Sequence, residues 1–506
     1  MRLLLPALLC LTGGPAAILL KKRRSRNLFV FGITLLSSLL LGWICQAGDL
    51  PEFTLLRITE LFSLSFRVDP SSRIFLLLIA FLWPLASLYA FEYMASHLAG
   101  SGGAGSAASA GKGGSVSENV RDAEKRESRF FAFYTVSYGI TQLLAMSSGL
   151  FTLYVFYECL TLVTLPLVTY HEDGDSLRAG MTYLKYTVGG AALGLLGIIA
   201  LASFGASGSF TPGGLLPAGL TFEQETFLRA VFLLSFLGFG SKAALFPLSP
   251  WLPRASVAPT PVTALLHAVA VVNAGVFACI RLIYDCFGPA LLAGSWAQTA
   301  AILLSAFTIL FGAVMAVRER HLKRRLAWST VYHLSYMLFS ASLMTSAGLA
   351  GAFTHLVFHG LMKISLFYCA GAFQIRAGAE YLPDLRGIRR AMPWTVGFYT
   401  LAALALTGVP PLIGFLSKWA ILSAAVPAGS WPAWIGAAAV ILSSVLAAVY
   451  LLEPAVQMLF MQGEHAGASD PGWRILIPLG ILAFCLVVPG IWPAPVRALI
   501  DAAALP

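Results

Sequence analysis

Long apolar stretches separated by short polar loops run from one end of the chain to the other. A helix that crosses a bilayer needs about 20 predominantly apolar residues. By that criterion about fourteen stretches are long enough, and they begin near residues 2, 27, 73, 130, 150, 178, 226, 261, 294, 325, 350, 394, 432 and 474. The pattern predicts an all-α polytopic membrane protein with about 14 transmembrane helices.

Composition supports the same class of protein. Of the 506 residues, 58% are hydrophobic and only 11% are charged, whereas soluble chains carry about 25% charged residues. The net charge of +10 comes from basic residues in short loops. Membrane topology accounts for that distribution, so we expect contact with a lipid bilayer and no nucleic-acid partner.

Loop charge predicts the orientation of the helices. Lys and Arg gather in the loops after the first, third, ninth and eleventh stretches, and the loops after most even stretches hold almost none. The basic loops are residues 21–26, 112–129, 318–325 and 376–390. Because basic loops stay on the cytoplasmic side, an even number of helices places both termini on the outer side.

Two segments between the apolar stretches have a character of their own. Residues 48–72 alternate apolar and polar side chains around Phe62, Leu64 and Phe66, which favours an external β-hairpin. Residues 99–129 begin with Gly, Ser and Ala, and we expect them to form a mobile cytoplasmic linker. The boundaries that follow are 1–98 for helices 1–3, 99–129 for the linker, and 462–506 for helix 14 and the C-terminal tail.

One short motif occurs twice, each time around a lysine. Gly238-Phe239-Gly240-Ser241-Lys242 is echoed by Gly414-Phe415-Leu416-Ser417-Lys418, and the two lysines lie 176 residues apart. Both motifs are embedded in long apolar stretches. Internal symmetry with an interrupted apolar segment in each half is typical of ion-translocating membrane proteins. The sequence therefore predicts two related halves, each organised around a buried lysine.

Helix-breaking residues flank both lysines. They are Pro247, Pro250 and Pro253 after the first lysine, and Gly408, Pro410 and Pro411 before the second. A break in a spanning helix frees backbone groups, which is tolerated where those groups line a hydrated cavity. We interpret the breaks as a route for water to the lysines, and a purely structural kink is the alternative.

Ionisable residues lie within several stretches, although each costs about 2.5–3.5 kcal/mol at mid-membrane on insertion scales. Glu158, Lys185 and Lys242 lie in the fifth, sixth and seventh stretches. A glutamate beside a lysine in a low dielectric forms a pair whose protonation states depend on each other. We predict a proton relay at these residues, and a static salt bridge that fixes helix packing is the alternative.

The eleventh stretch carries a polar stripe. His355, His359 and Lys363 follow i, i+4, i+8 spacing, so they share one helix face over about 12 Å. Histidine titrates near neutral pH, and such a stripe can pass protons through intervening water. Metal ligation by the two histidines is the alternative, but no carboxylate or thiolate accompanies them on this helix, and we predict no metal site.

Three further residues are weaker candidates for the relay. His267 and His333 lie in the eighth and tenth stretches, and either could instead be a hydrogen-bonded core residue. Glu453 in the thirteenth stretch is a candidate exit group for the second half. The alternative for Glu453 is an ion pair with a neighbouring helix or with a partner subunit.

No residues for bond chemistry or for a bound cofactor are evident. The seven cysteines form no CxxC pair, so they give no signal for an iron–sulfur cluster, a zinc site or a disulfide framework. Phosphate loops, nucleophile elbows and metalloprotease motifs are missing from the sequence. We therefore expect no catalytic residue, no cofactor and no metal in this chain.

The motifs around the two lysines resemble those of a known family. Residues 238–268 contain GFGSKAALFPL, WLP and APTPVTALLHA, residues 323–330 read KRRLAWST, and residues 408–415 read GVPPLIGF. Together they resemble the antiporter-like subunits, which are the proton-pumping membrane subunits of respiratory complex I, of membrane-bound hydrogenases and of Mrp-type sodium/proton antiporters. The resemblance covers roughly residues 50–460.

The resemblance implies a fold with two inverted five-helix repeats. Helices 4–8 would form the first repeat in residues 130–286 and helices 9–13 the second in residues 287–461, with helices 7 and 12 broken. The family's conserved positions fall on Glu158 in helix 5, Lys242 in helix 7, the stripe His355, His359 and Lys363 in helix 11, and Lys418 in helix 12. The short C-terminal segment is similar to that of M-type or D-type subunits.

The chain departs from the family pattern at two positions. Asn273 stands where family members often have a lysine in helix 8, so a relay toward the second half would need water or His267. Arg254 follows Trp-Leu-Pro where many members have an aspartate, which places a base near the inlet of the first half-channel.

The resemblance implies a proton-translocating, non-catalytic subunit of a redox-driven complex such as a complex I-like NADH:quinone oxidoreductase or a membrane-bound hydrogenase. Flavin, iron–sulfur or nickel–iron groups would then belong to partner subunits, in a bacterial or archaeal cell membrane. The first alternative is a subunit of an Mrp-type Na⁺/H⁺ antiporter. The second is a structural or assembly subunit with an inactive channel.

Overall fold

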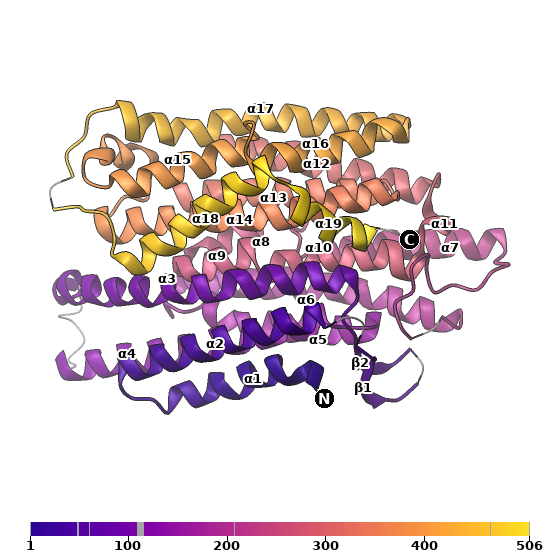
Figure 1. The fold of residues 1–506 in the computed structure, drawn as a ribbon, viewed down its shortest axis with the longest axis horizontal. Helices are drawn as coiled ribbons and strands as arrows, with labels where there is room; N and C mark the ends of the chain where they lie inside the picture. The colour runs from indigo at the N-terminus through magenta and orange to yellow at the C-terminus, as the bar shows by residue number, and fades with distance from the viewer. Residues whose placement is uncertain are drawn as a thin grey trace.

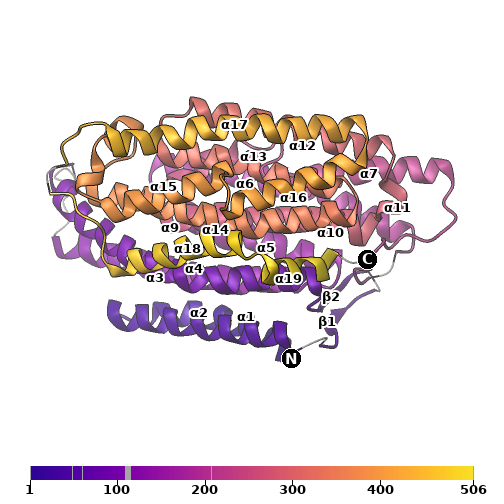
Figure 2. The same cartoon turned by 45° about the horizontal axis from the view of Figure 1, so that its top comes forward.

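The computed structural model describes residues 2–47, 50–59, 61–108, 116–206, 208–465 and 467–504. Within these ranges the protein is a bundle of helices that run roughly along its longest axis (Figure 1). In the turned view α1 and α2 lie at one edge of the bundle and α17 at the opposite edge (Figure 2).

Among the described residues, the first part of the chain, up to Phe287, holds ten α-helices and one hairpin. The helices are α1 (Leu5–Ile18), α2 (Arg23–Gln46), α3 (Pro70–Ala108), α4 (Val116–Ala145), α5 (Leu150–Val168), α6 (Gly174–Ser203), α7 (Phe222–Gly240), α8 (Trp251–Arg254), α9 (Thr260–Ala268) and α10 (Val271–Arg281). The shorter elements are η1 (Arg2–Leu4), β1 (Phe53–Arg57), β2 (Ser63–Phe66), η2 (Ala255–Val257) and the π-helical η3 (Leu282–Phe287).

The second half continues with nine helices. They are α11 (Pro289–Leu292), α12 (Trp296–Arg318), α13 (Leu322–Ser342), α14 (Ser346–Ala377), α15 (Pro393–Thr407), α16 (Ile413–Ala428), α17 (Trp431–Phe460), α18 (Trp473–Ile491) and α19 (Ala494–Ala504). Two 3-10 segments, η4 (Leu382–Leu385) and η5 (Ile388–Arg390), connect α14 to α15.

Nine spans in the described part of the chain are long and apolar enough to cross a membrane. They are Arg23–Gln46, Pro70–Ser96, Leu150–Val168, Gly174–Ser203, Thr260–Phe287, Trp296–Arg318, Ser346–Ala377, Trp431–Phe460 and Trp473–Ile491. The other stretches predicted from the sequence lie in helices that are shorter or more polar, such as Ile413–Ala428. The structure thus shows a predominantly helical protein with several membrane-spanning segments.

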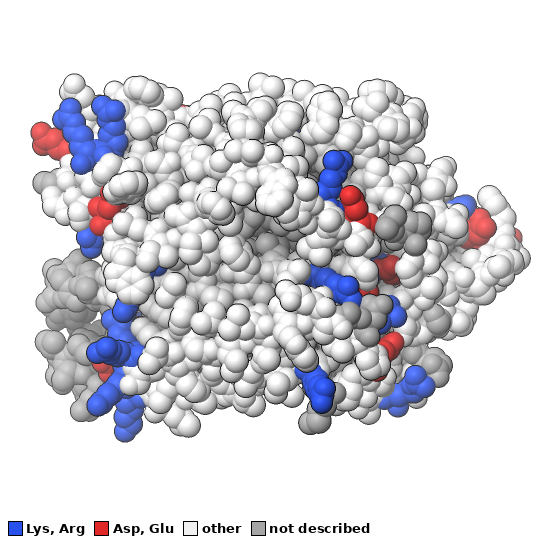
Figure 3. Space-filling view, in the orientation of Figure 1, with Lys and Arg blue, Asp and Glu red and all other residues white. Residues whose placement is uncertain are grey.

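Charged side chains are sparse in the middle of the molecule. On the face shown in Figure 3, Lys, Arg, Asp and Glu gather toward the two ends of the long axis, and the band between them is almost free of charge. Charged residues are costly in hydrocarbon and are tolerated at its edges. The band therefore matches the part of the bundle that lies in lipid or against other apolar surfaces.

Local sequence signals fix where several helices begin. The Asp173 side chain accepts a hydrogen bond from the Ser176 backbone N–H and starts α6. Thr221 and Gln224 form the corresponding capping box at α7. These caps satisfy backbone N–H groups that have no partner inside the helix.

The predicted hairpin is confirmed. β1 pairs with β2 in antiparallel register, with Phe53 opposite Phe66, and residues 48, 49 and 60 lie outside the described part of the chain. An isolated bridge joins Phe66 to Ser147, so the hairpin lies on the turn between α4 and α5. Of the predicted linker 99–129, residues up to Ala108 belong to α3 and residues from Val116 belong to α4. Residues 109–115 lie outside the described ranges.

The chain leaves helical geometry beside each of the two lysines. α7 ends at Gly240, and the chain turns before α8 begins at Trp251; α15 ends at Thr407, and α16 begins at Ile413. A further interruption separates α9 from α10, which the sequence pattern did not predict. There the Asn273 Nδ2 donates to the freed Ala268 carbonyl at 3.0 Å, so the amide replaces a lost backbone hydrogen bond.

The C-terminal helices lie across the middle of the bundle. In Figure 2, α18 and α19 lie over α3 and α14, and both helices contact α3 and α14. α14 also contacts α9, α13, α15 and α16. This places the polar stripe of α14 at the centre of the molecule, where elements from both halves of the chain meet.

Candidate functional site

Lys242 lies in the turn that follows α7 and is fully buried. Its Nζ is 3.8 Å from Oε1 of Glu158 on α5, and the Glu158 side chain keeps 22% of its surface exposed. Nζ also donates to the Tyr157 carbonyl and lies 3.4 Å from the centroid of the Tyr157 ring. The structure therefore brings together the two residues that the sequence predicted as a coupled pair.

The turn around Lys242 is held by side chains that replace missing helix contacts. The Tyr157 hydroxyl donates to the Phe239 carbonyl at 2.8 Å, and the Trp251 Nε1 donates to the Ser241 carbonyl at 2.8 Å. Gly275 of α10 packs so closely that an added Cβ would lie 2.9 Å from the Lys242 Cβ. Since these contacts come from α5, α8 and α10, the position of Lys242 depends on three separate elements.

The attraction between Lys242 and Glu158 opposes a comparable cost of burial. Two unit charges about 4 Å apart interact by roughly 4 kcal/mol at an effective dielectric constant of 20. Removing each ion from water costs several kcal/mol. Because these two free energies nearly balance, a nearby charge or water molecule can decide whether the pair is ionised.

Lys185 is not part of this pair. It lies on the exposed side of α6, and among the described residues it makes no hydrogen bond or ion pair. Instead it lines a pocket of about 510 Å³ together with Arg254 and other residues of α6. A role for Lys185 in a relay remains a prediction.

Lys418 occupies the equivalent position in the second half. It lies on α16 with 6% of its surface exposed, and its Nζ donates to the Thr407 carbonyl at 2.7 Å. That carbonyl belongs to the last residue of α15, where Gly408 turns the chain with φ of +98°. A Cβ at position 408 would lie 3.1 Å from the Lys418 Cδ, so the glycine makes room for the lysine.

Three histidines cluster next to Lys418. His333 Nδ1 lies 3.0 Å from His355 Nε2, and His355 Nδ1 lies 3.0 Å from the Ser417 hydroxyl. The His359 ring centroid is 5.5 Å from that of His333 and 5.9 Å from that of His355. His333 and His355 thus form a hydrogen-bonded line from α13 through α14 to Ser417 of α16, one residue before Lys418, and His359 packs beside this line.

Lys363 continues the stripe of α14 toward the first half. It is fully buried, and its Nζ donates to the Leu326 carbonyl at 2.9 Å and to the Ser329 hydroxyl. His267 at the end of α9 packs its ring 4.9 Å from that of Phe367. Neither ring nitrogen of His267 or of His359 has a hydrogen-bond partner within the described chain. Buried polar groups of this kind are the usual partners of internal water.

Glu453 is held by an arginine and is not isolated. Its Oε2 lies 2.6 Å from Nη2 of Arg325 on α13, and 43% of the Glu453 side chain is exposed. Arg325 is almost completely buried and also donates to the carbonyls of Ala316 and Val317. The structure therefore shows the ion pair with a neighbouring helix that the sequence left open for Glu453.

Sequence reasoning missed several residues that shape the site. Tyr157 and Tyr336 each turn a ring toward one of the two lysines, at 3.4 Å and 6.0 Å from Nζ to centroid. Ser417 and Ser329 provide hydroxyls to His355 and Lys363. The neighbourhood of Ser417 to Lys418 and of Tyr157 to Glu158 was visible in the sequence. The partners of Ser329 and Tyr336 come from other helices, and no local pattern reveals them.

No site for a metal ion is formed by the described residues. Within them, no group of three or more His, Cys, Asp or Glu has the arrangement to hold a metal. The seven cysteines are all free thiols. What the arrangement offers is a series of buried groups that can gain, lose or relay a proton, spread over α5, α13, α14 and α16.

The chain belongs to the family described as NADH:quinone oxidoreductase/Mrp antiporter, TM, whose model matches residues 147–447. That range includes Glu158, Lys242, the histidine cluster and Lys418. The match confirms the resemblance drawn from the motifs around the two lysines.

Relatives come from more than one kind of complex. The chain is 32% identical over 410 residues to NADH-quinone oxidoreductase subunit L of Mycobacterium tuberculosis, covering 80% of this chain and 59% of the relative. It is 31% identical over 375 residues to hydrogenase-4 component B of Escherichia coli, covering 71% of this chain and 51% of the relative. The chain therefore spans a little over half the length of these two relatives.

A solved structure shares the fold over the full length of the chain. A subunit of the membrane-bound sulfane sulfur reductase, an archaeal respiratory membrane complex, aligns with a TM-score of 0.81 and 25% identity. The alignment covers 100% of this chain and 97% of that chain. The chain is thus an antiporter-like membrane subunit of the kind found in complex I, hydrogenase and Mrp-type complexes.

Proposed function

We propose that the chain translocates protons as one membrane subunit of a multi-subunit, redox-driven complex. One observation carries the proposal. Each half of the chain places a buried lysine beside a break in a helix. Lys242 lies 3.8 Å from the Glu158 carboxylate, and Lys418 follows Ser417, whose hydroxyl is hydrogen bonded to His355. Buried ionisable residues in a membrane protein usually mark an ion pathway, because their cost is otherwise uncompensated.

The proposed architecture is that of about 14 membrane-spanning helices with two inverted repeats of five. In it α5 and the break after α7 would hold the first lysine site, and α13, α14 and the break before α16 would hold the second. Both termini would lie on the outer side, opposite the basic loops. Nine described spans support a membrane bundle of this general kind.

The Glu158–Lys242 pair would act as the switch of the first half. When a proton reaches Lys242 the pair becomes more strongly ionic, and when Glu158 takes a proton Lys242 loses its counter-ion. In the second half, His333, His355 and Ser417 would pass a proton along their hydrogen bonds toward Lys418. Lys363 and His267 would connect the halves through water. Asn273 would not take part in this connection, because its amide N–H group donates to the Ala268 carbonyl.

No redox group is needed in this chain under the proposal. Flavin, iron–sulfur or nickel–iron centres would belong to partner subunits, and the charge movement they cause would reach Glu158 or Lys242 through the membrane. Other membrane subunits are the expected partners, since the sulfane sulfur reductase with the same fold is a respiratory membrane complex.

The test begins with gentle isolation of the native complex. Visible absorbance of flavin or iron–sulfur groups in the co-purified material is the expected result. The complex is then reconstituted in vesicles, and proton uptake is measured on addition of the redox substrate for the unaltered protein and for Lys242→Ala. Translocation should be lost in the variant while the amount of assembled complex stays the same. Loss of assembly without specific loss of flux would instead favour a static salt bridge.

A second candidate is a subunit of a multi-subunit cation/proton antiporter. The observation in its favour is that the matched family includes Mrp antiporters as well as oxidoreductases. Colourless membrane partners, together with proton flux that depends on a Na⁺ gradient, would support this candidate and contradict the redox-driven one. Colourless partners without flux would leave the inactive, structural subunit as the conclusion.

A further inference from the structure

A cavity opens at the end of the bundle where the β-hairpin and both chain termini lie. Its volume is about 390 Å³. Six parts of the chain line it: the start of α3 with the segment before it, the loop after α6, the end of α10 with η3, the start of α11, the turn from α13 into α14, and the end of α19. The relay described above does not use this cavity.

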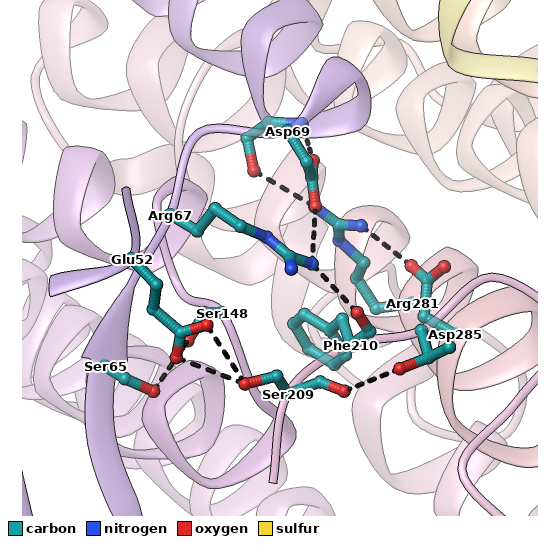
Figure 4. Close-up of polar contacts among 11 residues, drawn as sticks. Glu52, Ser65, Arg67, Asp69, Ser148, Ser209, Phe210, Arg281 and Asp285 are labelled. Carbon is teal, nitrogen blue, oxygen red and sulfur yellow. Dashed lines mark hydrogen bonds and ion pairs between the residues drawn. The ribbon is translucent and has the colours of Figure 1, made fainter. Parts of the chain in front are cut away.

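One wall of the cavity is a buried arginine between two aspartates. Arg281 Nη2 lies 2.6 Å from Asp69 Oδ1 and 2.7 Å from Asp69 Oδ2, while Nη1 lies 2.8 Å from Asp285 Oδ2. Figure 4 shows the Arg281 guanidinium reaching Asp69 on one side and Asp285 on the other. The guanidinium carbon also lies 4.9 Å from the ring centroids of Phe210 and Phe277.

Asp69 and Asp285 differ in how many of their carboxylate oxygens have a protein partner. Both oxygens of Asp69 contact Arg281, and Asp69 also caps α3 by accepting from the Ser72 backbone N–H at 2.8 Å. Burial raises the pKa of Asp69, but the charge and hydrogen bonds of Arg281 outweigh burial, and the net pKa is lower than usual. Asp69 is therefore a fixed anion that holds Arg281 in place.

Asp285 keeps one oxygen free. Only Oδ2 contacts Arg281, and no hydrogen bond to Oδ1 occurs among the described residues. The residue is 92% buried, since its relative exposure is 8%, and it lines the cavity. The Asp285 side chain keeps 11% of its surface exposed. A carboxylate oxygen without a protein partner, on a residue that lines a cavity, is satisfied by a water molecule or by a proton.

The floor of the cavity lies close to the histidine cluster. Leu349 lines the cavity, and His355 follows it by six residues on the same helix, which is about 9 Å along α14. Ile280 also lines the cavity, and Asn273 precedes it by seven residues, about 10 Å along α10. About 9–10 Å of helix therefore separates the cavity lining from the residues at the centre of the proposed relay.

We propose that this cavity is the hydrated outlet of the proton path, and that Asp285 is its last proton-accepting side chain. The inference rests on the proposed proton translocation. An excess proton carried as hydronium at the inner end of the cavity binds Asp285 Oδ1 and forms an O–H bond, which leaves a neutral water molecule. The proton then passes to water at the mouth of the cavity, and the carboxylate returns to its pair with Arg281. No electrons move in this step.

The first test compares two carboxylates at the same end of the molecule. Asp285→Asn in the assembled, reconstituted complex should lower proton translocation at least tenfold, and Asp285→Glu should restore part of it. Glu52→Gln is the matched control. Glu52 also appears in Figure 4, where Ser148 and Ser209 donate to it, but it does not line the cavity. Translocation by Glu52→Gln should equal that of the unaltered complex.

The second test does not depend on Asp285. Leu349→Cys places a thiol at the cavity floor, and a membrane-impermeant maleimide added to sealed vesicles should label it from the side that carries the termini. Leu442→Cys on α17 is the control, because Leu442 is exposed in the middle of an apolar span and should stay unlabelled. Labelling is scored against the native cysteines of the unaltered chain.

The outcomes separate the outlet from the proposed function. Normal flux in Asp285→Asn, or an unlabelled Leu349→Cys in a complex that translocates protons, overturns the outlet and leaves the proposed function standing. An unaltered complex that moves no protons overturns the proposed function, and the outlet with it. Reduced flux in Asp285→Asn together with labelling of Leu349→Cys supports the outlet.

Discussion

Lys242 and Lys418 have similar surroundings in the two halves of the chain, but different groups contact their ammonium groups. Both follow a Gly-Phe-X-Ser motif, both are buried beside a break in a helix, and both lie near a tyrosine ring, Tyr157 or Tyr336. Lys242 has a carboxylate at 3.8 Å. Lys418 donates to a backbone carbonyl freed by the break, 2.7 Å away.

Lys242 thus interacts with a charged group, whereas Lys418 interacts with the dipole of a backbone carbonyl. A carboxylate can lose its charge by taking a proton, so Glu158 can change the protonation of Lys242. A carbonyl keeps the same dipole in every state, so Thr407 holds Lys418 without switching it. Glu453 is the acidic residue predicted for the relay of the second half, and its carboxylate is paired with Arg325. Under the proposed function, the second lysine would therefore depend on the hydrogen-bonded pair His333 and His355 for its changes of charge.

Removal of either lysine should have the largest effect on proton translocation. Lys242→Ala and Lys418→Ala should each lower proton translocation by about 10²-fold, the lower end of the range for the loss of a proton-transferring group. Lys125→Ala, on an exposed part of α4, should leave it unchanged. Proton uptake into vesicles containing the assembled complex measures all three. If Lys418→Ala keeps most of the flux while Lys242→Ala loses it, only the first half conducts.

The next largest effect is on stability, and it should differ between Glu158 and Glu453. Glu158→Gln leaves the buried Lys242 without its counter-ion and should lower the free energy of unfolding by about 1–3 kcal/mol, since Glu158 is partly exposed. Glu453→Gln should cost less, because Arg325 keeps its two carbonyl partners and Glu453 is 43% exposed. Thermal unfolding in detergent compares the two. Equal losses would contradict the difference between a switchable pair and a structural one.

The break beside Lys418 can be altered without touching the lysine. Gly408→Ala adds a Cβ at φ of +98°, 3.1 Å from the Lys418 Cδ, and should cost about 1–3 kcal/mol of stability through backbone strain. Gly397→Ala on α15 is the matched control, because a Cβ there meets no atom within 4 Å. Chemical denaturation in detergent measures both variants. Similar stability of the two would show that the turn at Gly408 relaxes freely.

The smallest effect concerns loop contacts in the two halves. Glu380 lies 3.5 Å from His321 Nε2 and accepts from Gln374 at 2.6 Å, whereas the Arg129–Glu172 pair of the first half is 55% exposed on both sides. Hydrogen bonding by His321, with help from Gln374 and Lys323, lowers the pKa of Glu380 to about 2. A lowered pKa gives stability that is present above the pKa of the unfolded state and is lost as the pH falls toward 2.

Glu380→Gln should therefore lower stability by less than about 1 kcal/mol across pH 5 to 8, because the carboxylate is ionised throughout that range and 38% exposed. Glu172→Gln should have no measurable effect. Thermal shifts at three pH values test both. A deficit for Glu380→Gln that disappears between pH 8 and pH 5 would contradict the lowered pKa.

Much of the site could be predicted because its members are local in sequence. The spacing of His355, His359 and Lys363 defines a helix face without any tertiary information. The repeated Gly-Phe-X-Ser-Lys motif and the nearby prolines and glycines identified both lysines and both breaks. Lys185 shows the limit of this reasoning, since depth in a helix does not say which way a side chain faces. In the structure Lys185 lies on the exposed side of α6 and forms no ion pair with Glu158 among the described residues.

Composition and apolar spacing alone determined that this chain is a helical membrane protein, because lipid requires long apolar helices and makes buried charges costly and rare. The repeated motif added the position of the two buried lysines. Only the tertiary structure decided which of the buried charged and polar side chains contact one another. Packing between different helices brings Arg325 to Glu453 and His333 to His355, and packing of η3 and α10 against the start of α3 brings Arg281 to Asp69. No local pattern encodes such contacts, because an ion pair or hydrogen bond depends on the relative position of two helices, which packing over the whole bundle sets.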